Sequence, residues 1–314
     1  MTICRTQSST RRNVQLAALE APPWFAPGPP NDAEAALDIE MAQAMAPGAK
    51  LLVFEGSLGI TNHGDALLHA MATWTPSLTT ASSSWSFGRN DNTQQAVDEM
   101  AAQGASYFVY SGDFGDIGDP QDTRDLNNQT LVGGTQLSTV STTPLLASLP
   151  PPVVYPNNYY SGDLTWNAAS ALQQKAVTGG GIMDGNNKNG SGDGGGPVPI
   201  PSYQIGVSMA TNGGSTQFRN FPDVALLANN IEIVFNGNPI IVGGTSAAAP
   251  LWAGFMALVN QNSQKNGFEP KSGFVNPALY FIGKTRGSSN DLYSVCFNDV
   301  NDNASNFDGF GPGP

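Results

Sequence analysis

Residues 242–250 read Val-Gly-Gly-Thr-Ser-Ala-Ala-Ala-Pro, and an apolar run continues from there to residue 259. The pattern predicts a strand, a tight glycine turn, a serine and then a helix that is apolar all round, as buried helices are. Pro250 fits the first helical turn, where its missing N–H breaks no hydrogen bond. Ser246 is therefore expected at a helix N-terminus, where free N–H groups and the helix dipole favour developing negative charge. This position suits a nucleophile, and the alternative is a serine that only caps the helix.

Residues 33–46 (AEAALDIEMAQAMA) form a predicted helix that is closed by a Pro-Gly pair. At about 100° per residue, its leucine and methionines make an apolar stripe, and Glu34 and Asp38 fall within or beside that stripe. The two acidic side chains are neighbours because they are four residues apart, and burying them is costly unless they pair or share a proton. Such a pair has split proton affinities, which acid–base chemistry uses. A favourable contact with the helix dipole is the alternative for Glu34, but it does not explain Asp38.

A third acid, Asp113, follows the apolar strand predicted over residues 107–110. In open parallel α/β sheets, sites assemble outside the carboxyl ends of the strands. Asp113 is therefore a candidate site residue, and the alternative is an ordinary turn aspartate.

Strand and helix patterns alternate along the 314 residues, which suffice for one large α/β domain. This alternation predicts a mostly parallel sheet covered by helices on both faces. Residues 184–196 (DGNNKNGSGDGGG) form a low-complexity loop, interpreted as a surface insertion in preference to a calcium-binding or substrate-gating loop. The predicted strands are residues 51–54, 107–110, 130–132, 231–235 and 240–242, and the predicted helices are residues 33–46, 64–73, 92–103 and 250–261.

Taken in order, the motifs of this chain resemble the sedolisin family, the serine-carboxyl peptidases of peptidase family S53. The resemblance covers roughly residues 31–308 and implies a subtilisin-like α/β fold with a mostly parallel central sheet flanked by helices on both faces. It implies a catalytic domain over residues 31–314, behind an irregular segment at residues 1–30 in which no convincing strand is found. The main motifs are Glu34-x-x-x-Asp38, residues 84–88 (SWSFG), residues 111–113 (SGD) and residues 244–250 (GTSAAAP).

The resemblance implies a serine-type peptidase with a Ser-Glu-Asp triad that hydrolyses peptide bonds at acidic pH. In this assignment Ser246 is the nucleophile, Glu34 is the general base, and Asp38 hydrogen-bonds to Glu34. Asp113, kept protonated, would donate to the oxyanion of the tetrahedral intermediate. A carboxylate base with a reference pKa of about 4 is best matched to serine activation in acid. Burial and low pH would both keep a proton on Asp113.

Three residues that match the end of a strand in the family, Ser84, Trp85 and Ser86, are expected to bind substrate. In the family this strand borders the catalytic cleft, so an extended peptide could add to it by strand pairing. Trp85 is expected to line the cleft and not the core. Whether cleavage is of the endopeptidase or the tripeptidyl type is left open, since the family includes both.

The family also has a calcium site late in the sequence. Asp299 and the carbonyl of Val300 match its first ligands, and Asp308 is the remaining candidate. Calcium takes about six to eight oxygen ligands. The Gly-Tyr-Asp and Thr-Gly-x-Gly ending of the family is not found after Val300, so an incomplete cage and weak binding are expected.

The composition is acidic, with a formal net charge of −12, a sequence pI of about 4.3 and 12% charged residues. This balance argues against nucleic acid as a partner, and few carboxylate ion pairs are available for acid to break. No run of 18 apolar residues is present, so no membrane span is expected. The family implies protein or peptide substrates and a secreted monomer made with a pro-domain. Whether Cys4 and Cys296 are paired is left open.

Two other interpretations of the chain remain. One is a truncated, catalytically inactive homologue that at most binds peptides. The other is a subtilisin-type peptidase with a Ser-His-Asp triad, because Asp38, His63 and Ser246 run in the subtilisin order. That triad leaves Glu34 unexplained and needs an asparagine where Asp113 stands, so a pH optimum separates the two mechanisms.

Overall fold

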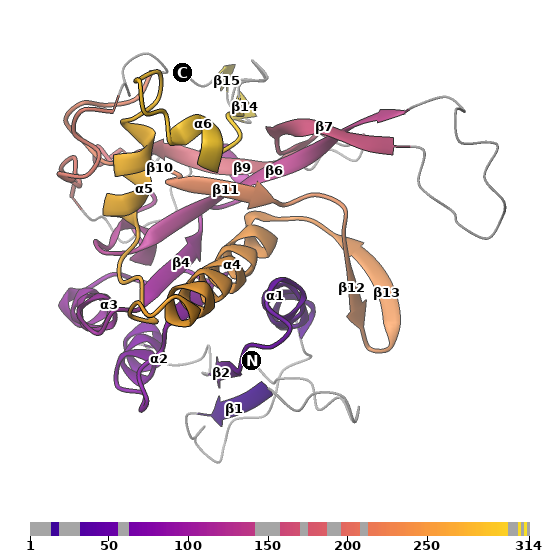
Figure 1. The fold of residues 1–314 in the computed structure, drawn as a ribbon, viewed down its shortest axis with the longest axis vertical. Coiled ribbons are helices and arrows are strands. Elements are labelled where there is room, and N and C mark those ends of the chain that lie inside the picture. The colour runs from indigo at the N-terminus through magenta and orange to yellow at the C-terminus, as the bar shows by residue number, and fades with distance from the viewer. Residues whose placement is uncertain are drawn as a thin grey trace, which may run out of the picture.

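The computed structural model describes residues 14–18, 32–55, 63–141, 158–169, 175–186, 196–207, 213–300, 307–308 and 311–312. Its centre is a five-stranded sheet (Figure 1). Four of its strands are parallel and lie in the order β11 (Val224–Leu227), β6 (Thr130–Ser141), β4 (Ser106–Tyr110) and β3 (Thr80–Ser83). The fifth, β7 (Asn158–Thr165), pairs antiparallel with β6. The predicted α/β class with a mostly parallel sheet is confirmed.

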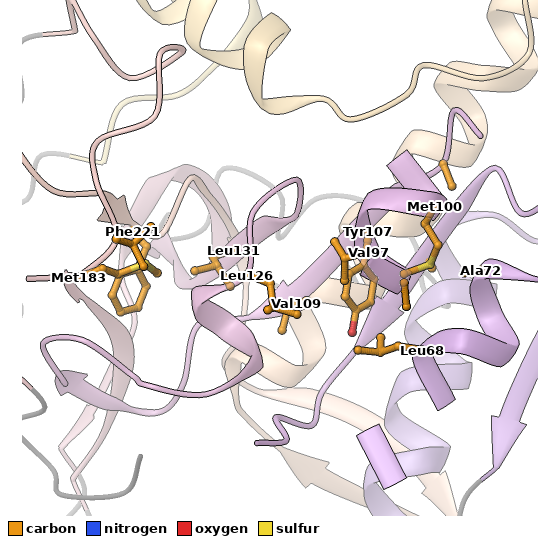
Figure 2. Packing of buried hydrophobic residues seen from close by; sticks show 14 of the residues in the cluster. Leu68, Ala72, Val97, Met100, Tyr107, Val109, Leu126, Leu131, Met183 and Phe221 are labelled. Carbon is orange, nitrogen blue, oxygen red and sulfur yellow. The ribbon is translucent and has the colours of Figure 1, made fainter. Parts of the chain in front are cut away.

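One face of this sheet packs against α2 (His63–Ala72) and α3 (Asp91–Ala102). Side chains alternate between the two faces of a strand, so Tyr107 and Val109 of β4 point to the same side. They join Leu68 of α2 and Met100 of α3 in a buried apolar cluster (Figure 2). The helix pair thereby fixes the position of β4, whose carboxyl end leads to Asp113.

The opposite face of the sheet packs against α4 (Thr245–Lys265). Phe108 points to this side, and its ring stacks on Trp252 with a centroid distance of 6.2 Å. The first six residues of α4 are buried, whereas Phe255 and Leu258 further along are 42% and 39% exposed. The prediction of a buried helix therefore holds for the first turns of α4, where Ser246 lies.

Helix α1 (Asp32–Met45) lies beside α4 (Figure 1). A Cβ atom on Gly254 of α4 would lie 2.8 Å from the Cβ of Met45 and 3.1 Å from the carbonyl oxygen of Ala42, both on α1. Because real Cβ atoms almost never approach so closely, the two helices meet at a point that only glycine allows. This close approach brings the acids of α1 to the start of α4.

The strands predicted at residues 231–235 and 240–242 exist as β12 (Ile231–Phe235) and β13 (Asn238–Val242), but they form a separate antiparallel hairpin. Ile231 and Ile233 pack onto α1. The turn residues Asn236 and Gly237 have φ of 51° and 78°. An Asn-Gly pair with two positive φ angles is the usual two-residue hairpin turn, so the sequence carried this signal.

Strand β1 (Val14–Ala18) pairs in parallel with β2 (Leu51–Glu55) in a two-stranded sheet of its own. The expectation of an irregular segment over residues 1–30 is therefore wrong at these five residues. The pairing joins segments on either side of α1, and the pattern of the five residues of β1 (VQLAA) is too short to predict a strand by itself.

A second sheet contains β5 (Phe114–Asp116), β9 (Lys175–Ile182) and β10 (Asn220–Phe221), with β8 (Asn167–Ala169) paired to β9. The remaining elements are a 3₁₀ turn (Thr123–Asp125), α5 (Asn276–Gly283), α6 (Tyr293–Cys296), β14 (Phe307–Asp308) and β15 (Gly311–Pro312). None of the described helices combines the length and the apolar character that crossing a membrane requires.

Two sequence features fall largely outside the described residues. Residues 187–195 of the low-complexity loop are among them, as is Cys4. Cys296 is exposed and has a free thiol.

Candidate active site

Ser246 is the second residue of α4, directly after the glycine turn that follows β13. The predicted order of strand, turn, serine and helix is confirmed. Gly244 has φ of 152°, in the region that favours glycine, and a Cβ atom there would lie 3.1 Å from Oδ2 of Asp113. The glycine therefore lets the start of α4 approach Asp113.

Pro250 is the sixth residue of α4 and not part of its first turn, which corrects the prediction. The helix begins at Thr245 because Asp113, 132 residues earlier, accepts hydrogen bonds from the backbone N–H and hydroxyl of Thr245. In an α-helix the N–H of residue 250 would bond to the carbonyl of residue 246, and proline has no N–H. The Ser246 carbonyl instead accepts a hydrogen bond from the Ser84 hydroxyl at 3.2 Å.

The two acids of α1 lie beside Ser246. The Ser246 hydroxyl lies beside the Glu34 carboxyl, whose Oε1 is buried with no hydrogen-bond partner among the described residues. Burial raises the pKa of Glu34, the Ser246 hydroxyl lowers it, and the charge of Asp113 raises it further. Glu34 is thus a stronger base than a solvated glutamate, next to the hydroxyl it would deprotonate.

Asp38 lies next to Glu34 and accepts a hydrogen bond from the Ser84 hydroxyl at 2.6 Å. Burial raises the pKa of Asp38 well above its usual range, and the neighbouring Glu34 raises it further, while the bond from Ser84 lowers it. Two acids this close do not both ionise readily, so the pair titrates as a unit and holds a proton in weak acid.

Asp113 reaches the site from the connection between β4 and β5. The Thr245 N–H and hydroxyl lie 2.8 and 2.9 Å from the same oxygen, Oδ1. Burial raises the pKa of Asp113, and this effect exceeds the lowering by the Thr245 bonds and by the charge of Arg124. Oδ1 is occupied by these donors, which leaves Oδ2 as the oxygen that can carry a proton.

The structure therefore brings together all four predicted catalytic residues, Ser246, Glu34, Asp38 and Asp113. They come from α1, from the end of β4 and from α4, and each is held by packing or hydrogen bonds that do not involve a ligand. A hydroxyl at a helix N-terminus, a base in contact with it and an acid with a raised pKa are the parts that acyl transfer requires.

Three similar proteins show where this arrangement belongs. Kumamolisin of Bacillus sp. (strain MN-32) is 30% identical over 266 residues, which are 81% of this chain and 43% of kumamolisin. Tripeptidyl-peptidase sed1 of Aspergillus fumigatus is 42% identical over 89 residues, covering 26% of this chain and 14% of that protein. A solved structure of a Pseudomonas sedolisin (serine-carboxyl proteinase), complexed with pseudo-iodotyrostatin, matches with a TM-score of 0.69 at 20% identity, over 95% of this chain and 76% of that one.

The chain is similar in sequence and in fold to members of the sedolisin family. The subtilisin-like fold expected from the sequence is confirmed by the solved sedolisin. No family model matches the chain. It spans less than half the length of the two curated relatives described above.

The residues expected to bind substrate lie directly after β3. Ser84 is buried, and its hydroxyl faces Asp38 and the Ser246 carbonyl. The Ser86 hydroxyl lies 3.1 Å from the hydroxyl of Tyr110. Trp85 and Asp38 both line a largely apolar cavity of about 620 Å³ between α1, α4, β2 and β3. Binding of substrate by these three residues stays a prediction.

The residues expected to bind calcium do not form a site in the described part of the chain. The Asp299 carboxylate is ion-paired with Arg286 and accepts a hydrogen bond from the Tyr293 hydroxyl at 2.9 Å. The side chain of Asp308 lies outside the description, and no described cluster of three or more His, Cys, Asp and Glu side chains could hold a metal. A carboxylate neutralised by a guanidinium is a poor calcium ligand, so the described residues do not fit the cation.

His63, the candidate base of the alternative subtilisin triad, is the first residue of α2, and its side chain lies outside the described residues.

Two features of the site region were not predicted. The first is the role of Thr245, which stands directly before the candidate nucleophile and binds Asp113 through its backbone N–H and its hydroxyl.

The second missed feature is a buried acid pair, Asp119 and Asp125, which are 0% and 3% exposed. The pKa of Asp125 is raised to about 9, chiefly by burial and then by Asp119, and neither of its buried carboxyl oxygens has a hydrogen-bond partner among the described residues. Arg89 approaches Asp125 at 3.3 Å and opposes this rise. Asp119 also accepts bonds from the backbone N–H groups of residues 121 and 185. The pair holds a proton throughout the acidic range.

Proposed function

We propose that the chain is a sedolisin-type serine peptidase that hydrolyses peptide bonds of protein or peptide substrates at acidic pH. The observation that carries the proposal is the position of the Ser246 hydroxyl beside Glu34, a buried carboxyl with Asp38 and Asp113 around it. The names of the relatives support it, since they are a tripeptidyl-peptidase and a serine-carboxyl proteinase.

In the proposed reaction, Oγ of Ser246 attacks the substrate carbonyl carbon while Glu34 takes the hydroxyl proton. The new C–O bond moves an electron pair onto the carbonyl oxygen, which becomes the oxyanion. Glu34 then returns the proton to the leaving amine nitrogen as the C–N bond breaks, and water repeats the sequence on the acyl-enzyme. The raised pKa of Glu34 supports this role, because it brings the base closer to the proton affinity that the transfer demands.

Asp113 is proposed to stabilise the oxyanion as a protonated acid. The backbone N–H and the hydroxyl of Thr245 both donate hydrogen bonds to Oδ1, so the proton resides on Oδ2. From there it can form a hydrogen bond to the oxyanion as negative charge develops. Removing one such donor from an oxyanion hole typically costs about 10²- to 10³-fold in kcat. Asp38 is proposed to hold Glu34 in place through the proton that the pair shares.

The wider setting is proposed from the family. We expect a secreted monomer whose precursor carries a pro-domain. We expect at most weak calcium binding, since Arg286 already neutralises Asp299.

The test is hydrolysis of denatured protein by the purified chain from about pH 3 to about pH 8, beside Ser246→Ala and Glu34→Gln. Acid-only activity that both substitutions abolish is the expected result. Glu40→Gln is a matched control, because Glu40 is on the same helix and its carboxylate bonds to the backbone of Val234 on the hairpin. Activity near neutral pH that survives Glu34→Gln would indicate the histidine mechanism through His63. A folded chain with no activity would indicate the inactive homologue.

A further inference from the structure

The starting point is the carbonyl group of the candidate nucleophile. Pro250 cannot supply the N–H that would normally bond to the Ser246 carbonyl within α4. The Ser84 hydroxyl takes that place at 3.2 Å, although it comes from the end of β3, 162 residues earlier. The backbone of the nucleophile is therefore tied to a side chain outside its own helix.

The same hydroxyl lies 2.6 Å from Oδ1 of Asp38. A serine hydroxyl donates one hydrogen bond and can also accept hydrogen bonds, so two arrangements are possible between Asp38 and the Ser246 carbonyl. When Asp38 is ionised, Ser84 donates to the carboxylate, and a bond to a charged oxygen is short and strong. When Oδ1 is protonated, Asp38 donates to Ser84, and the Ser84 hydrogen is free to turn to the Ser246 carbonyl.

We propose that Ser84 is a positioning residue that links the protonation of Asp38 to the backbone of Ser246, and that it does not bind substrate. The inference rests on the proposed peptidase function and deepens it. Ser84 is suited to the role because it is only 7% exposed and its hydroxyl lies between the two groups it would connect.

The charges around Asp38 fix the direction of the effect. Glu34 acts on Asp38 from the same helix and disfavours its ionisation, while Asp113 acts on Glu34 from the end of β4. The bond from Ser84 favours the ionised form of Asp38. Without that bond, the Glu34–Asp38 pair should hold its proton to higher pH, and the acidic limb of the activity profile should move the same way.

The test compares the pH dependence of kcat and KM in the wild type, Ser84→Ala and Ser84→Thr. We expect Ser84→Ala to lower kcat about tenfold, to leave KM within about twofold, and to move the acidic limb up by about one pH unit, since a bond to a charged group is lost. Ser84→Thr keeps the hydroxyl and should restore the profile. A raised KM with unchanged kcat would show a substrate-binding role and overturn the inference.

Two further measurements keep the inference separate from the peptidase function. The first is the titration of ¹³C-labelled carboxyl groups in a Ser246→Ala background, which needs no activity. Ser84→Ala should raise the titration midpoint of Asp38 there, and an unchanged midpoint overturns the inference even if the chain is a peptidase. The second is a double-mutant cycle with Pro250→Ala, which restores a helical N–H to the Ser246 carbonyl. Additive changes in melting temperature would refute the shared carbonyl contact.

Discussion

The buried acid pair predicts that the fold loses stability as the pH rises from acid to neutral. Asp125 has a reference pKa of 3.8 and a pKa of about 9 in the folded chain. A group whose folded-state pKa is raised contributes stability fully below its unfolded pKa, and that contribution is lost as pH rises toward the folded pKa. Between about pH 4 and about pH 9, the unfolded chain releases a proton that the folded chain keeps.

The size of the stability loss follows from the release of one proton on unfolding between about pH 4 and about pH 9. Each pH unit changes the free energy of unfolding by about 1.4 kcal/mol, so the step from about pH 4 to about pH 7 removes about 4 kcal/mol. Domains are typically stable by about 5–15 kcal/mol, so this loss is a large fraction of the total. Arg89, at 3.3 Å from Asp125, and Asp122 in the same turn are the other charged groups that act on it.

The perturbation is Asp125→Asn, which replaces a protonated acid by a neutral amide of the same shape. Urea unfolding is measured at both pH values in a Ser246→Ala background, so that the chain cannot digest itself. The parent should lose about 4 kcal/mol more than Asp125→Asn between the two pH values. Asp91→Asn, at an exposed acid, is the control and should behave like its parent. Equal pH dependence in the parent and Asp125→Asn would refute the reasoning.

Three further predictions concern the site. Gly254→Ala places a Cβ atom 2.8 Å from Met45, so it should push α1 from α4, lower the free energy of unfolding by about 1–3 kcal/mol and reduce kcat at least tenfold. Gly283→Ala, on a helix with open space around the new atom, should do neither, and a similar loss there would contradict the explanation. Asp113→Asn keeps a donor that cannot ionise, so the alkaline limb of kcat should move to higher pH, and an unmoved limb would show that Asp113 does not set it. Millimolar calcium should change the melting temperature by less than about 2 °C, whereas Arg286→Gln should enlarge that change by freeing Asp299; a large shift in the parent would contradict the assignment of Asp299 to Arg286.

Local sequence signals predicted the parts of the site that lie on single elements. The glycine turn before an apolar run placed Ser246 at a helix start, and the four-residue spacing placed Glu34 and Asp38 together. An apolar strand followed by Ser-Gly-Asp placed Asp113 at a strand end. Each of these predictions follows from helical spacing or from the end of a helix or strand, and both can be recognised within about ten residues of sequence.

The features that sequence did not predict depend on contacts between distant segments. The start of α4 was placed too late because Thr245 joins the helix through Asp113, which no local rule brings near. The contact of Ser84 with the Ser246 carbonyl depends on the packing of β3 against α4. The pairing of Asp119 with Asp125 needs a loop whose shape is set partly by the backbone of residue 185.

The distance along the chain between α1 and α4 has a consequence for how the protein is made. The acids at residues 34 and 38 are synthesised before the strands of the central sheet, and the serine at residue 246 is synthesised after all of them. The docking of α4 through Gly254 is therefore a late event that completes the set of reacting groups. A growing chain of this design therefore lacks a complete set of the proposed reacting groups until α4 has been synthesised and has docked on α1.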